Sequence, residues 1–133
     1  MSAWWVQADV LARSGRPGYP SRQLKRAEID HWLYELSYFR IKSVICLLSK
    51  ELQLYEELLR EEGGLLGLYR AQGWVVHSIS VEDYKNPALD DQELAAVVRA
   101  FRKGPKPVLV HCSAGMDRTG MAVAHLQQLG LVK

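Results

Sequence analysis

The chain has few of the features that would set it apart from an ordinary globular protein. Only two of its 133 residues are cysteines, which argues against a disulfide scaffold and favours a reducing compartment. The formal net charge is +2 without a basic run, so neither nucleic acid nor a membrane surface is indicated as a partner. No apolar stretch approaches the length that crosses a bilayer, and residues 1–9 lack the pattern of a signal peptide. We therefore expect a cytoplasmic protein.

The size and composition of the chain indicate one domain. Hydrophobic residues make up 48% of the sequence and charged residues 24%, which is ordinary for a protein with a single core. The sequence contains no repeat, no low-complexity segment and no cluster of metal ligands. We predict a single domain over residues 1–133 that needs neither a metal nor a cofactor.

Strand-like and helix-like patterns alternate along the chain. Strands are predicted at 3–12, 41–48, 74–81 and 107–110, and helices after an N-cap at Ser21, at 49–62, at 65–72, from Asp90 or Asp91 to 103, and at 121–129. Continuous apolar runs such as 41–48 are typical of parallel strands that are covered on both faces. We predict an α/β fold, a three-layer sandwich with a mostly parallel central sheet flanked by helices.

One stretch, His111 to Gly120, concentrates the residues that can do chemistry; its sequence is HCSAGMDRTG. It follows the predicted strand 107–110 and leads into the predicted helix 121–129. A strand, a tight loop of small residues and a helix together direct backbone N–H groups and a positive helix end at one point. Because a cysteine opens this loop and an arginine closes it, the sequence predicts an anion site between them.

The stretch has the form His-Cys-x-x-Gly-x-x-Arg-Thr-Gly. It resembles the Cys-x5-Arg signature of the protein-tyrosine phosphatase superfamily, nearest to its small dual-specificity members, in which an Ala-x-Ser-Gly-Arg-Pro segment like 12–17 is also frequent. The resemblance implies hydrolysis of phosphomonoesters, above all phosphotyrosine and also phosphoserine or phosphothreonine in proteins, through a cysteinyl-phosphate. A phosphatase of a phosphoinositide, an inositol phosphate or an RNA 5′-phosphate, and a non-catalytic module that binds phosphorylated partners, remain as alternatives.

The chemistry of the loop gives its residues distinct expected roles. Only a thiolate attacks phosphorus efficiently, and the helix end, the amide donors and a guanidinium all favour that form of Cys112. Arg118 offers a planar fork that can bind two phosphoryl oxygens, and a glycine permits a tight turn toward the ligand. The expected phosphate-binding residues are Ser113, Ala114, Gly115, Met116, Asp117 and Arg118. The resemblance implies that His111 orders the loop, and Thr119 is expected to donate a hydrogen bond to the sulfur.

A general acid is also required, because the leaving oxygen must be protonated. The resemblance implies an aspartate about thirty residues before the cysteine, and Asp83, in the segment DYKNP, is our first choice. Asp117 is the alternative, since the Asp-Arg-Thr order is similar to that of myotubularin-type and some bacterial phosphatases. Met116 stands where the lipid-active bacterial type carries a lysine, which weakens the case for a polyanionic inositol headgroup.

Several further residues have an open or a purely structural interpretation. Cys46, within the predicted strand 41–48, is expected to be a buried inert thiol, with a redox partnership with Cys112 as the alternative. Arg13 and Arg16 are expected to be structural rather than to touch substrate. The chain continues only briefly past its last predicted helix, so either a minimal family member or a truncated one is expected, and its oligomeric state is open.

Overall fold

A computed structural model describes residues 3–133 of the chain; residues 1 and 2, which begin the N-terminal stretch considered above, lie outside the described residues. Strands and helices alternate along most of the chain, with two short 3-10 segments in the middle. In order they are β1 (Ala3–Gln7), β2 (Leu11–Ser14), α1 (Arg26–Ser37), β3 (Ser43–Cys46), η1 (Lys50–Tyr55), η2 (Arg60–Glu62), α2 (Gly64–Ala71), β4 (Val75–Ser78), α3 (Asp91–Lys103), β5 (Val108–His111) and α4 (Asp117–Gln128).

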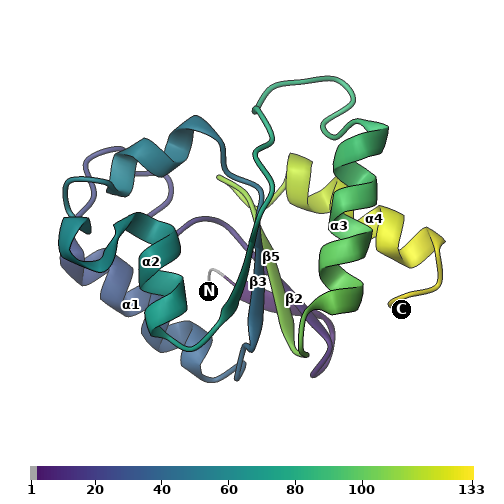
Figure 1. Cartoon of the computed structure of the whole chain (residues 1–133), viewed down its shortest axis with the longest axis horizontal. Coiled ribbons are helices and arrows are strands. Elements are labelled where there is room, and N and C mark those ends of the chain that lie inside the picture. Colours follow the sequence, from purple (N-terminus) through teal and green to yellow (C-terminus); the bar gives the residue numbers. More distant parts are fainter. Residues whose placement is uncertain (1–2) are drawn as a thin grey trace.

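The strands form one sheet in the order β1-β2-β5-β3-β4. The strand β1 pairs antiparallel with β2, whereas the pairs β2–β5, β5–β3 and β3–β4 are parallel. The helices α1 and α2 cover one face of this sheet, and α3 and α4 cover the other (Figure 1). The predicted three-layer α/β sandwich with a mostly parallel sheet is confirmed.

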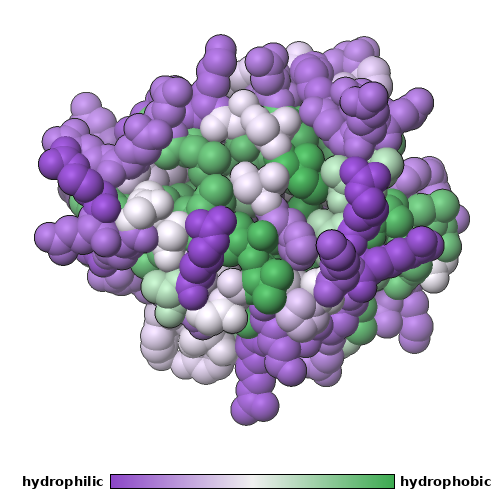
Figure 2. Space-filling model, in the orientation of Figure 1, coloured by the Kyte–Doolittle hydropathy of each residue, from purple (hydrophilic) through white to green (hydrophobic). Residues whose placement is uncertain are grey.

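Each face of the sheet carries its own hydrophobic core. On β5, Leu109 points into the core beneath α1 and α2, while Val108 and Val110 point into the core beneath α3 and α4. This alternation is the period of two that a strand imposes on its side chains. The edge strand β4 is less covered: hydrophobic residues gather over the strands in the middle of the face in Figure 2, and Val75 is 46% exposed.

Two predicted elements were wrong. The segment 3–12 forms a hairpin rather than one strand, because Asp9 adopts a positive φ of 63° and Val10 donates a hydrogen bond to the Gln7 carbonyl at 3.0 Å. The segment 49–62 is not one helix but the two 3-10 pieces η1 and η2. These irregular turns bury both Tyr55 and Leu59. The charged residues around them in the sequence gave no sign of this burial.

The predicted N-cap at Ser21 was also wrong. The Ser21 hydroxyl makes local hydrogen bonds with Gln23, and the first helix begins at Arg26 with Lys25 as its N-cap. By contrast, Asp90 caps α3 as expected, and its carboxylate accepts a hydrogen bond from the Glu93 N–H at 2.7 Å. The difference is that Asp90 has Glu at the third helical position to complete a capping box, a signal absent after Ser21.

The parallel strands β2, β5, β3 and β4 all end at the same edge of the sheet, which is the upper edge in Figure 1. Four loops therefore meet there: residues 15–25 after β2, 112–116 after β5, the segment around η1 after β3, and 79–90 after β4. Ligands of open α/β sheets bind outside these strand ends. This edge is where the predicted site residues are brought together.

Candidate active site

The loop after β5 has the predicted strand–loop–helix setting. β5 ends at His111, and α4 begins at Asp117, so Arg118 lies in its first turn. Gly115 has a φ of +78°, and a Cβ at this position would lie 2.6 Å from the Ser14 carbonyl. Glycine is therefore required, because the loop both turns through a left-handed conformation and packs against the end of β2.

The carbonyl groups of this loop are held away from its centre. The Ser113 carbonyl accepts a hydrogen bond from the Arg16 backbone N–H at 2.9 Å, and the Gly115 carbonyl accepts one from Arg13 Nη2 at 2.8 Å. Within residues 3–133, the N–H groups of Ser113, Ala114 and Gly115 donate to no protein group. The loop thus presents several unused donors beside a helix N-terminus, which is the arrangement that binds an anion.

Arg13 and Arg16 therefore support the loop from behind. Arg16 donates from Nε to the Ser113 hydroxyl at 3.1 Å, from Nη1 to Tyr55 and from Nη2 to the Ser21 carbonyl, and it is only 3% exposed. These contacts agree with the structural role expected from the sequence. They tie the N-terminal part of the chain directly to the loop about a hundred residues later.

Cys112 lies at the start of the loop and is nearly buried, with 2% of its surface exposed. Both cysteines are free thiols. Cys46 packs in the core beneath α1 and α2, whereas Cys112 packs on the opposite face, so the two side chains point to different sides of the sheet. Burial raises the pKa of the Cys46 thiol to about 12, as expected for an inert cysteine.

Arg118 is 1% exposed and is fixed by groups from the neighbouring strand ends. Its Nη1 donates to the carbonyls of Leu47 and Val81, at 3.1 and 2.7 Å, and its Nη2 donates to Glu51 Oε2 at 2.5 Å. Its Nε is buried without a partner among the described residues. The guanidinium is thus anchored on one edge and keeps a free donor for a ligand.

Glu51 is the main charge partner of Arg118. Burial raises the pKa of Glu51, but the Arg118 hydrogen bond and backbone hydrogen bonds outweigh it, and the pKa is lowered overall. Burial on its own lowers the pKa of Arg118, but the hydrogen bond to Glu51 outweighs it, and the pKa is raised overall. Glu51 was missed in the sequence because it belongs to a run of charged residues. Its one distinguishing signal is its position just after a central strand.

The two candidate acids have different surroundings. Asp83 Oδ2 lies 3.3 Å from Arg118 Nη2, and Oδ1 accepts a hydrogen bond from the Tyr84 N–H at 3.0 Å. Asp117 is exposed at the start of α4, and its carboxylate has no ion pair or hydrogen bond within the described chain. The structure therefore brings Asp83, but not the Asp117 side chain, into contact with the arginine of the loop.

His111 is fully buried behind the loop and makes two hydrogen bonds. Its Nδ1 lies 3.1 Å from the Cys112 carbonyl, and its Nε2 lies 2.8 Å from the Tyr69 hydroxyl. A carbonyl only accepts, so Nδ1 carries the proton and Tyr69 donates to Nε2. Burial lowers the pKa of His111 to about 4, which keeps the ring neutral. Tyr69, which the sequence analysis missed, thus fixes the tautomer that orders the loop.

Thr119 does not make its predicted contact. Its hydroxyl is buried without a hydrogen-bond partner within residues 3–133, so the bond to the Cys112 sulfur is absent. Thr119 follows Arg118 in the first turn of α4.

The neutral state of His111 predicts a loss of stability in mild acid. The pKa of His111 falls from 6.5 in the unfolded state to about 4 in the folded state. Between these two pH values the unfolded state therefore binds more protons than the folded state. The contribution of His111 to stability is therefore fully present above the pKa of the unfolded state. It is lost as the pH falls toward the pKa of the folded state. We expect the free energy of unfolding to fall by about 2 kcal/mol from about pH 7.5 to about pH 5.

Urea unfolding at the two pH values measures this change. The matched variants are His111→Asn, which keeps hydrogen-bonding groups but does not titrate, and His31→Gln, which removes an exposed histidine. The decline should be much smaller in His111→Asn and unchanged in His31→Gln. An equal decline in His111→Asn and in the wild type would contradict the assignment.

A cavity of about 510 Å³ opens beside this site. Ser113 lines it from the loop, Glu51 and Asp83 line it from the neighbouring strand ends, and Arg22 and Lys50 add two cations. Cys112 and Arg118 do not line it, in keeping with their burial. Among the described residues, no group of three histidine, cysteine or acidic side chains could hold a metal ion, and no helix is long and apolar enough to cross a membrane.

Comparisons with known proteins agree with this geometry. Residues 70–132, which contain β4, Asp83 and the entire loop, match the model of a tyrosine phosphatase family. No curated protein matches the sequence. A solved structure of the core catalytic domain of the PP-IP phosphatase SIW14 from S. cerevisiae, in complex with citrate, is similar at a TM-score of 0.64 and 20% identity over 98% of this chain.

The kinase-associated phosphatase KAP, solved with its catalytic cysteine replaced by serine, is similar at a TM-score of 0.58 and 16% identity over 90% of this chain. The chain spans 68% and 65% of the length of these two structures. The structural likeness establishes the fold, and the family match covers the loop that carries the signature. Residues 70–132 thus match a tyrosine phosphatase family, and the chain as a whole has the fold of these two phosphatase structures.

Proposed function

We propose that the protein hydrolyses phosphomonoesters, with phosphotyrosine in proteins as its main substrate and phosphoserine or phosphothreonine as further ones. The observation that carries the proposal is the loop 112–118, which begins with Cys112 and holds unused backbone donors, a helix N-terminus and the unpartnered Nε of Arg118. Such a site stabilises the three outer oxygens of a phosphoryl group during transfer.

In the proposed first step the Cys112 thiolate attacks phosphorus, an S–P bond forms, and the P–O bond to the substrate breaks. Asp83 donates a proton to the departing oxygen. In the second step water attacks phosphorus, Asp83 takes a proton from that water, and the S–P bond breaks to release inorganic phosphate and the thiolate. No other reactant is consumed, and no metal is required.

The Asp83–Arg118 contact suggests how substrate binding prepares the acid. The carboxylate occupies a donor edge of the guanidinium that a phosphoryl oxygen would use. A dianionic substrate competes for this edge, and Asp83 is then released from Arg118 and can turn toward the leaving oxygen. Glu51 and the two carbonyls continue to hold Arg118 while this exchange takes place.

The charge around the cavity favours a substrate with one phosphate group. The lining cations Arg22 and Lys50 are outnumbered by the lining carboxylates Glu51, Glu82 and Asp83. Each additional phosphate of an inositol polyphosphate needs a cationic partner of its own. The similarity to a PP-IP phosphatase keeps an inositol pyrophosphate as the alternative substrate. In this cavity, only Arg22 and Lys50 of the described residues could pair with its additional phosphates.

A substrate panel on the purified protein tests the proposal. Phosphate release is measured with a phosphotyrosine peptide, its phosphoserine counterpart, a phosphoinositide, an inositol pyrophosphate and an RNA 5′-phosphate, each with and without EDTA. We expect the kcat/KM for the phosphotyrosine peptide to exceed the others by at least about tenfold, because the aryl oxide is the best leaving group among the single phosphates. A higher value for the inositol pyrophosphate, or loss of activity in EDTA, would overturn the proposal.

A further inference from the structure

A second and larger cavity, of about 760 Å³, lies next to the loop 112–118. Ala114 and Met116 line it from the loop, and none of its lining residues belongs to the Asp83 segment. A substrate whose phosphate is held by the loop therefore has this cavity within reach of its neighbouring groups. The inference below rests on the proposed function and concerns what this cavity selects.

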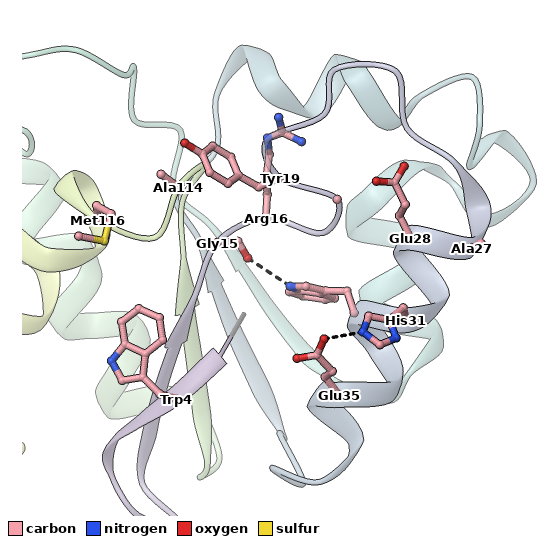
Figure 3. Close-up of a pocket in the computed structure, with 12 residues that line it drawn as sticks. Trp4, Gly15, Arg16, Tyr19, Ala27, Glu28, His31, Glu35, Ala114 and Met116 are labelled. Carbon is pink, nitrogen blue, oxygen red and sulfur yellow. Dashed lines mark hydrogen bonds and ion pairs between the residues drawn. The ribbon is translucent and has the colours of Figure 1, made fainter. Parts of the chain in front are cut away.

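The wall on the loop side is aromatic and apolar. Trp4, Tyr19 and Met116 are 44%, 49% and 60% exposed, so their surfaces are open to a ligand, and the buried Trp32 lines the cavity from α1. Trp32 is fixed there by its hydrogen bond from Nε1 to the Gly15 carbonyl at 3.2 Å (Figure 3). Exposed aromatic rings grouped around a cavity are typical of a binding site rather than of free surface.

The wall on the helix side is acidic. Glu28 and Glu35 lie on the same face of α1, and both extend toward the cavity across from Trp4 and Met116 (Figure 3). Glu28 accepts a hydrogen bond from the Lys25 N–H, and Glu35 lies 2.8 Å from His31 Nε2, so both carboxylates are held in place. These contacts orient the carboxylates at the cavity edge.

The cation in the lining, Arg16, is not available to an anionic ligand. Its three donor nitrogens are used by Ser113, Tyr55 and the Ser21 carbonyl, and its guanidinium stacks on Tyr19 at 5.5 Å. Arg13 stacks on Trp4 in the same way at 5.1 Å. Each of these rings thus has one contact with a guanidinium group of the chain, and because about half of each side chain is still exposed, it keeps free surface for a ligand cation.

We propose that this cavity binds the side chain of an arginine or lysine next to the phosphorylated residue of a peptide substrate. Aromatic faces attract a cation through their quadrupole, and carboxylates add charge-assisted hydrogen bonds, so the two walls are complementary to one basic side chain. Phosphate and basic side chain then occupy adjoining sites of opposite charge. A polyanionic ligand is rejected from the second site by the same two carboxylates.

Paired peptides measure this selectivity. Each carries one phosphotyrosine and differs only in having arginine or glutamate at a single position, scanned over three residues on either side. At one position the wild type should show a preference for arginine of about tenfold in kcat/KM, the sum of a cation–π contact and partly exposed ion pairs. In Glu28→Gln/Glu35→Gln, which keeps the hydrogen-bonding shape, the ratio should fall to about threefold, the part that the cation–π contact alone supplies.

The matched control is Glu56→Gln/Glu57→Gln, which removes the same charge from exposed positions outside both cavities and should keep the full preference. An independent readout on the wild type is ionic strength, since the arginine preference should shrink as salt screens it. Equal rates for the paired peptides, or an arginine preference that is undiminished in Glu28→Gln/Glu35→Gln, would overturn the cavity assignment alone. Failure to hydrolyse any of the peptides would instead overturn the proposed function on which it rests.

Discussion

Replacing Cys112 with serine is expected to abolish hydrolysis of an aryl phosphate, with a loss of at least about 10⁴-fold in kcat. The serine hydroxyl is hardly ionised at neutral pH, so the helix end and the loop amides have no anion to stabilise as a nucleophile. The donors themselves are unchanged, because the Ser113 and Gly115 carbonyls remain tied to Arg16 and Arg13. The variant should therefore still bind an oxyanion such as vanadate or phosphate, which calorimetry measures directly.

The control for this experiment is Cys46→Ala. Cys46 is fully buried on the opposite face of the sheet and contributes nothing to the proposed chemistry, so this variant should retain most of the activity. Rapid acid quenching of the wild type during turnover should trap the phosphoryl group on Cys112. Turnover by Cys112→Ser near the wild-type rate, or inactivity of a folded Cys46→Ala, would end the nucleophile assignment.

Replacing Asp83 with asparagine is expected to lower kcat by about 10²- to 10⁴-fold, but only for substrates whose leaving oxygen is basic. A phenolate that carries strongly electron-withdrawing groups departs without a proton, so its rate should change little. Asparagine keeps the size of the side chain and removes the acidic proton. A series of aryl phosphates with graded leaving groups should therefore give a steeper dependence on leaving-group basicity in the variant than in the wild type.

Asp117→Asn is the matched comparison, because it removes a carboxylate from the loop itself. A steeper dependence in this variant instead would assign the general acid to Asp117. Since Asp83 also contacts Arg118 at 3.3 Å, a third result is informative. A loss that is the same for every leaving group would show that Asp83 orients the guanidinium rather than transferring a proton.

The sequence was sufficient to predict the loop and the layers of the fold. Cys112, Gly115 and Arg118 stand at fixed spacings, and the small-residue loop between an apolar strand and a helix leaves few other arrangements possible. Asp83 was predicted from the family resemblance, which implies an aspartate about thirty residues before the cysteine, and its contact with Arg118 agrees with that choice. The local sequence pattern was therefore sufficient to predict those site residues that lie close together in the sequence.

The residues that were missed act across the sheet. Glu51 reaches Arg118 only because β3 and β5 are adjacent, and Tyr69 reaches His111 only because the His111 ring points to the face of the sheet that α2 covers. Neither relation has a sequence signal, since the strand order β1-β2-β5-β3-β4 is set by packing of both cores rather than by any one segment. The two 3-10 pieces were missed for the same reason, because the burial of Tyr55 overrides a charge pattern that favours a helix.

The strand order has a consequence for how the protein is made. β5 lies in the centre of the sheet, between β2 and β3, yet it comes last in sequence among the five described strands. Until it inserts, the first hairpin has no parallel neighbour, and Arg13 and Arg16 have no loop to hold. Closure of these distant contacts is therefore expected to limit the folding rate. The loop that carries Cys112 can therefore take its place only after β5 has inserted between β2 and β3.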